Sequence, residues 1–78
     1  MSKITSISYK ILSKVLEKDG FSLSRQKGDH LIYVKKGIIR PIVIPMYENL
    51  PIFVIKNNLR TAGINRKKYF EILRRTKK

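Results

Sequence analysis

Residues 20–35, which read GFSLSRQKGDHLIYVK, decide the fold of this chain. After Gly20, the larger side chains of Phe21, Leu23 and Arg25 alternate with Ser22, Ser24 and Gln26, and this alternation is typical of a β-strand. Lys27, Gly28 and Asp29 are turn-forming residues, and residues 30–35 again have the composition of a strand. Strands joined by so short a turn run antiparallel, so the segment predicts a β-hairpin.

The flanking segments add a helix before this hairpin and a third strand after it. From Ser6 or Ser8, either of which can cap a helix, apolar residues recur at helical spacing: Ile7, Ile11, Leu12, Val15 and Leu16. Gly20 is expected to end this helix in a left-handed conformation. Lys36 and Gly37 predict a tight turn before a strand over residues 38–44. Pro41 cannot donate to a ladder and predicts an edge position for that strand.

Two further helices are predicted after this strand. Asn49 can cap the first, whose apolar stripe consists of Ile52, Ile55, Leu59 and Ala62, and Gly63 ends it. Asn65 can begin the second, shorter helix. Its Phe70, together with Phe21 and Phe53, is expected in the core. The chain is thus predicted to be one α+β domain over residues 1–78, with element order α-β-β-β-α(-α). A three-stranded antiparallel sheet would carry the helices on one face, a layout that resembles a double-stranded-RNA-binding domain (dsRBD).

The composition points to an anionic partner. Eighteen Lys and Arg against five Asp and Glu give a formal net charge of +13, which is typical of nucleic-acid binding. An acidic protein partner is compatible with the same charge. Cysteine is absent, which excludes disulfides and thiolate metal sites, and no apolar run has the length of a membrane span. We therefore expect a cytoplasmic protein that has no cofactor and does not contact a membrane.

His30 is the single histidine of the chain and the obvious candidate for proton transfer near neutral pH. Arg25 and Lys27 are close enough in sequence to flank a phosphate group beside it. Gly28 would allow the close approach of a substrate to the backbone. We expect Tyr33 and Lys35 to contact RNA as well, although a tyrosine in a strand is more often part of the core.

Three motifs resemble the HicA toxin family. Residues 20–30 match the pattern G-F-x-x-x-R-x-x-G-S-H at every fixed position except Asp29. Residues 43–45 match the family's strand before its V-P segment, and residues 59–64 match L-R-Q-A-G-I except at Thr61. The family consists of small mRNA interferases that pair with HicB antitoxins and have a dsRBD-like fold. The resemblance implies that His30 is the catalytic residue of a metal-independent endoribonuclease. It also implies a free toxin that is monomeric and a hetero-oligomer with a HicB-like antitoxin.

Besides Thr61, the chain departs from the family pattern at four places. Asp29 stands in place of a serine, Met46 in place of a second histidine that often follows the V-P pair, and residues 53–54 in place of G-T. The fourth departure is the basic run 66–68, where relatives usually have acidic residues. The change at Asp29 is the one nearest to the predicted catalyst.

Metal-free RNA cleavage uses the 2′-OH of the RNA as the nucleophile, and it needs a base, an acid and positive charge at the phosphate. One histidine can perform one of the two proton transfers, and water, Lys27 or Tyr33 could assist the other. The alternative is a non-catalytic dsRBD-like RNA-binding module that holds RNA through phosphate contacts. The sequence leaves open whether His30 shares its face of the sheet with the helices.

Overall fold

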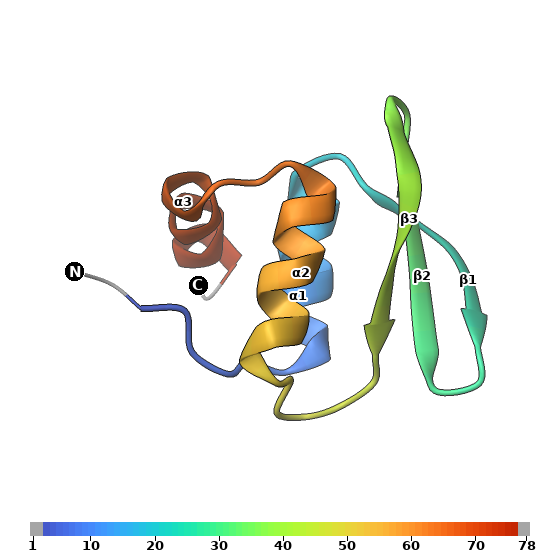
Figure 1. Ribbon diagram of the computed structural model, residues 1–78, viewed down its shortest axis with the longest axis horizontal. Helices are drawn as coiled ribbons and strands as arrows, with labels where there is room; N and C mark the ends of the chain where they lie inside the picture. The colour runs from blue at the N-terminus through green and yellow to red at the C-terminus, as the bar shows by residue number, and fades with distance from the viewer. Residues whose placement is uncertain (1–2, 77–78) are drawn as a thin grey trace.

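The computed structural model describes residues 3–76, and its helices and strands follow one another in the predicted order (Figure 1). They are α1 (Tyr9–Lys18), β1 (Ser22–Lys27), β2 (His30–Lys35), β3 (Ile38–Pro45), α2 (Ile52–Ala62) and α3 (Arg66–Thr76). The three strands form one antiparallel sheet in the order β1-β2-β3. All helices lie on the same side of it, and α3 packs mainly against α1. The predicted α+β fold is confirmed.

Both ends of α1 are set by local sequence. The Ser8 hydroxyl accepts a hydrogen bond from the amide of Lys10 at 3.2 Å, so Ser8 is the cap among the two predicted candidates. At the other end Gly20 has φ +100°, and its amide donates to the carbonyl of Glu17 at 3.1 Å. The next amide, that of Phe21, donates to the carbonyl of Leu16 at 2.9 Å, which completes a Schellman motif. This motif turns the chain from α1 directly into β1.

Two-residue turns join the strands. Gly28 has φ +58° and occupies the first central position between the paired residues Lys27 and His30. Gly37 has φ +91° between Lys35 and Ile38, which are also paired. A positive φ is costly for residues with a Cβ atom, so these glycines fix the turns. The prediction that the strand with Pro41 lies at an edge of the sheet is confirmed.

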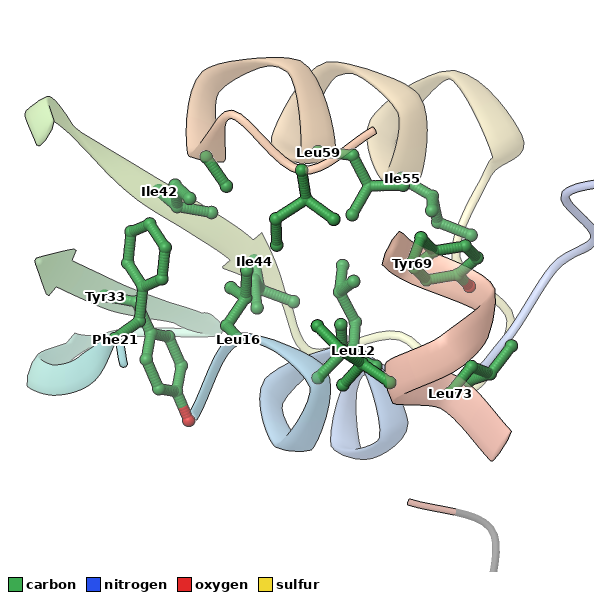
Figure 2. Packing of buried hydrophobic residues seen from close by; sticks show 14 of the residues in the cluster. Leu12, Leu16, Phe21, Tyr33, Ile42, Ile44, Ile55, Leu59, Tyr69 and Leu73 are labelled. Carbon is green, nitrogen blue, oxygen red and sulfur yellow. The ribbon is translucent and has the colours of Figure 1, made fainter. Parts of the chain in front are cut away.

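The inner face of the sheet forms the core together with the helices. Leu31 of β2 stands opposite Ile44 of β3, and Tyr33 stands opposite Ile42. Tyr33, Ile42 and Ile44 are each at most 2% exposed. Figure 2 shows Tyr33 and Ile42 at one end of the core and Tyr69 and Leu73 of α3 at the other. Phe21 lies beside Tyr33, and the other labelled members of the cluster fill the space between the two ends: Leu12, Leu16, Ile44, Ile55 and Leu59.

The later helices depart from the sequence expectation in several details. Ile52 of the predicted apolar stripe is 43% exposed, and α3 has 11 residues, as many as α2, although it was expected to be shorter. Pro51, not Asn49, precedes the first residue of α2, and no side chain caps that helix. Phe53 is 67% exposed instead of buried, because it projects from the face of α2 opposite to Ile55. The predicted ends hold elsewhere: Gly63 ends α2 at φ +74°, and the Asn65 side chain accepts from the amide of Lys68 at 2.8 Å.

A carboxylate at the end of α1 links three elements. Asp19, whose side chain is 3% exposed, contacts the ammonium groups of Lys35 at 3.2 Å and Lys68 at 2.7 Å. Burial by itself would raise the pKa of Asp19, but the hydrogen bonds and charges of the two lysines outweigh it and hold the pKa below its usual value. The two ion pairs of Asp19 therefore connect β2, through Lys35, and α3, through Lys68, to the end of α1. Among residues 3–76, no helix is long and apolar enough to cross a membrane.

Candidate active site on the outer face of the sheet

His30 projects from the outer face of the sheet. Its neighbour Leu31 and the next-but-one residue Tyr33 belong to the inner face, because they pair with buried residues of β3. Side chains alternate along a strand, so His30 and Ile32 point to the opposite, solvent-facing side. The side chain of His30 is accordingly exposed. The question of strand parity that the sequence left open is thus answered in favour of an accessible imidazole.

Strand pairing arranges the outer face in two rows that run across the sheet. Lys27, His30 and Pro45 stand directly opposite one another and form the first row. Arg25, Ile32 and Val43 form the second in the same way. Directly opposed residues of antiparallel strands have adjacent side chains on one face. Each row therefore places a cation of β1 next to a residue of β2.

A β-bulge in β1 is what brings Arg25 into this arrangement. The pairing shifts between Leu23 and Arg25, which leaves Ser24 as an extra residue. Strict alternation would place Leu23 and Arg25 on the same face, as the sequence pattern predicted. With the bulge, Leu23 stands opposite Tyr33 on the inner face and Arg25 opposite Ile32 on the outer face. The predicted alternation is wrong from Ser24 onward, and the bulge is the reason.

The backbone holds His30 at a defined place. It is the first residue of β2 and follows immediately on the turn at Gly28. The carbonyl of Asp29 accepts a hydrogen bond from the amide of Met46 at 2.8 Å, which ties the turn to the end of β3. A Cβ atom at Gly28 would meet nothing within 4 Å, so the turn is open on its outer side. The imidazole is thereby fixed by its strand yet reachable from solvent.

These side chains surround a hollow of about 490 Å³. Its lining residues are Arg25, Lys27, His30, Ile32, Pro41 and Val43. The three polar members were predicted as site residues, whereas the three apolar members were not. Ile32 could have been found from its spacing of two from His30, but only once the parity of β2 was known. Pro41 and Val43 come from β3 and depend on a register that no local signal reveals.

The hollow is positively charged. No acidic residue lines it, and among residues 3–76 no ion pair engages Arg25, Lys27 or His30. Asp29, the departure nearest to His30, forms no ion pair with it in this part of the chain either. No cluster of three or more potential metal ligands occurs within residues 3–76. The groups available for chemistry are thus an imidazole and two cations.

Two predicted RNA contacts lie elsewhere. Tyr33 is 2% exposed on the inner face, and its hydroxyl donates to the Glu17 carboxylate at 3.0 Å. This burial raises the pKa of Tyr33 and leaves no ring face for a base, so the prediction that Tyr33 contacts RNA is wrong for this structure. Lys35 contacts Asp19 at 3.2 Å at the other end of β2 and does not line the hollow.

Comparison with known protein families shows to which family the chain belongs. By its fold and sequence, this protein is a small basic α+β domain whose single histidine follows the turn of a β-hairpin. A family model described as the HicA toxin of bacterial toxin–antitoxin systems matches residues 9–64, from the start of α1 to just beyond α2. Because the match spans most of its 78 residues, this chain belongs to the HicA toxin family. No curated protein matched the chain. The match includes the whole His30 hollow and stops before α3.

Proposed function

We propose that this toxin is an endoribonuclease that cleaves mRNA without a metal ion and uses His30 as an acid–base catalyst. The observation that carries the proposal is the exposed His30 in a hollow with an apolar floor and two cations, Arg25 and Lys27, that form no ion pair within residues 3–76. The family supports a toxin, and the arrangement of the hollow supports RNA as its target.

The two cations are suited to a phosphate. Arg25 can donate two parallel hydrogen bonds to phosphate oxygens, and Lys27 adds a point charge in the row of His30. Both act on the negative charge that develops on the phosphorane as the phosphate is attacked. The net charge of +13 adds a long-range attraction for RNA that depends on salt.

The apolar floor is suited to a sugar or base. Ile32, Pro41 and Val43 offer aliphatic surface beside His30 and no hydrogen-bonding side chain. A nucleotide whose base is unstacked can rest on this surface while its phosphate lies between the cations. A continuous duplex would keep its bases stacked inside, so the hollow favours a single-stranded segment.

The reaction then needs two proton transfers. The 2′-oxygen forms a bond to phosphorus and loses its proton, the bond from phosphorus to the 5′-oxygen breaks, and the leaving oxygen gains a proton. The products are a 2′,3′-cyclic phosphate and a 5′-hydroxyl. His30 performs one transfer, and Lys27 or water performs the other. Tyr33, the third candidate, is excluded from this role by its burial.

An antitoxin completes the system. Membership of the family implies an antitoxin partner, and we propose a HicB-like protein that covers the His30 hollow in a hetero-oligomer. Acidic side chains of that partner would neutralise Arg25 and Lys27 and thereby exclude RNA.

Replacement of His30 by Ala tests the proposal. We expect cleavage of a labelled single-stranded RNA in EDTA to fall by about 10²–10⁴-fold, the contribution typical of a positioned acid or base. RNA binding by the variant should stay within about threefold of wild type, since the cations remain. Expression of the variant should no longer arrest growth. The chemical nature of the product ends, 2′,3′-cyclic phosphate and 5′-hydroxyl, provides a second readout.

Val34→Ala is the matched control, because Val34 lies on the same strand and outer face but outside the hollow. It should cleave RNA at the wild-type rate. A wild-type protein that binds RNA but releases no cleaved product would contradict the proposal and favour a non-catalytic RNA-binding module. Equal activity of His30→Ala and wild type would do the same for the role of the histidine.

A further inference from the structure

A second hollow lies on the helical side of the molecule, separate from the one at His30. Its volume is about 270 Å³. It is formed by the segment before α1, by α2, by the connection from α2 to α3 and by the start of α3. Its lining residues are Ile4, Lys56, Leu59, Arg60, Ile64 and Arg66. The two hollows share no residue, and in Figure 1 these helices lie on the opposite side of the sheet from its outer face.

The floor of this hollow is aliphatic and firmly packed. Leu59 and Ile64 are 4% and 5% exposed and belong to the hydrophobic core. Ile4 is partly buried and packs against the same core. The surface they offer is therefore fixed before any ligand arrives.

Three cations surround this floor. Lys56 and Arg60 are one helical turn apart on α2, and Arg66 is the first residue of α3. All three are exposed, and no acidic side chain lines the hollow. Like charges at this helical spacing repel each other, and a cation at a helix N-terminus opposes the macrodipole. The arrangement is thus unfavourable for the isolated protein.

Lys68, a neighbour of Arg66, differs from these three cations because an acidic side chain compensates its charge. It lies in the same first turn of α3, but its ammonium group contacts Asp19 at 2.7 Å. No ion pair among residues 3–76 engages Lys56, Arg60 or Arg66. A ligand that brings negative charge to these three cations would relieve their repulsion.

We infer that this hollow binds an acidic protein segment that inserts one apolar side chain between its carboxylates. The aliphatic floor would receive the apolar side chain, and Arg60 and Arg66 would pair with the carboxylates. RNA suits this hollow less well than the first, because no ring comparable to the imidazole of His30 lines it to stack on a base. A partner held here would leave His30 uncovered, so binding at this site and RNA binding could occur together.

A synthetic peptide tests the inference on the full chain. The probe is a short fluorescein-labelled peptide, blocked at both ends, in which a central Leu has Glu three and four residues away on either side. Its control carries Ser at the central position and the same charge. The protein variant is Arg60→Glu with Arg66→Glu, and Lys14→Glu with Arg74→Glu is the matched control, since these exposed cations of α1 and α3 lie outside the hollow. Circular dichroism verifies that both variants fold.

We expect the Leu peptide to bind wild type and the Lys14/Arg74 control with similar affinity. Its affinity for the Arg60/Arg66 variant should be lower by a factor of about ten or more. The Ser peptide should also bind wild type more weakly than the Leu peptide. Ile4→Gln, which keeps every charge, should weaken the Leu peptide but not the Ser peptide. Equal losses in both double variants would mean unspecific charge attraction and would overturn the inference. It would also be overturned if the Arg60/Arg66 change weakened a single-stranded RNA probe selectively and left the peptide unaffected, since the hollow would then be a nucleic-acid site.

Discussion

The two faces of the sheet are built from alternating residues of the same strands, yet they do different work. On β2, Tyr33 is buried against the helices, while His30 three residues earlier is exposed on the far side. The inner face of β2 and β3 contributes Tyr33, Ile42 and Ile44 to the core, which α1 and α2 cover. The outer face carries Arg25, Lys27 and His30 around an open hollow. The core and the proposed active site are thus separated by the pleat of the strands, and substitutions should affect stability or the proposed activity without affecting the other.

The largest expected effect is on the inner face. Ile44 is fully buried, and Ile44→Ala should lower the free energy of unfolding by about 2–5 kcal/mol, from lost burial and the cavity left behind. Ile39 on the same strand is 98% exposed, so Ile39→Ala should change the free energy of unfolding by less than about 0.5 kcal/mol. Urea unfolding monitored by circular dichroism measures both. Equal losses would show that the outer face also contributes to folding.

The second prediction concerns Asp19, whose negative charge links the end of α1 to Lys35 of β2 and Lys68 of α3. Asp19→Asn should lower the free energy of unfolding at pH 7 by about 1–3 kcal/mol, because the contacts with Lys35 and Lys68 lose their charge assistance. The pKa of Asp19 is lowered in the fold from its usual 3.8, so this stability is present above that pH and is lost as the pH falls through the lowered pKa. The gap between wild type and variant should therefore close in acid. A gap that stays constant between neutral pH and strong acid would refute the role of the carboxylate charge.

On the outer face, loss of a cation should weaken RNA binding and spare the fold. Arg25→Gln and Lys27→Gln should each reduce affinity for single-stranded RNA by about tenfold at low salt and lower the slope of log K against log salt by about 0.7. Their unfolding free energies should stay within about 0.5 kcal/mol of wild type. Fluorescence anisotropy across a salt series measures the first effect. Unchanged slopes would place the phosphate contacts elsewhere.

The smallest effect compares two buried tyrosines. Tyr33→Phe removes the hydrogen bond to Glu17 and should cost about 0.5–1.5 kcal/mol. Tyr69 is 1% exposed, burial raises its pKa to about 12, and its hydroxyl has no hydrogen-bond partner among residues 3–76. Tyr69→Phe should therefore leave stability unchanged or raise it slightly. Thermal unfolding of the two variants checks the order, and a larger loss for Tyr69→Phe would reveal a hidden partner.

The sequence predicted those parts of the fold that local chemistry controls. Gly28, Gly37 and Gly63 mark turns and a helix end because each adopts a positive φ that other residues avoid. The buried stripe of α2, which includes Ile55 and Leu59, followed from its spacing. The prediction that Phe53 lies in the core was wrong because it was based on hydrophobicity alone. Residues two positions apart on a helix lie on nearly opposite faces, so Phe53 points away from the buried side of Ile55.

The site was predictable only in part. His30 and its cations stood out because they are polar groups close together in one hairpin. The bulge at Ser24 could not be foreseen, since every residue of β1 is exposed and the residues after Leu23 are all polar, so nothing in their sequence indicates which face each occupies. Val43 joins the hollow only through pairing with Ile32, a contact set by the tertiary register.

The bulge at Ser24 also affects how separate copies of the protein can meet. β1 and β3 are the edge strands of an open sheet, and such edges are prone to recruit strands from other molecules. Ser24 interrupts the regular ladder of one edge, and Pro41 withholds an amide donor in the strand at the other. Neither margin offers an unbroken backbone template. The irregularity that turns Arg25 toward solvent thus also helps to guard a small, half-open sheet against self-aggregation.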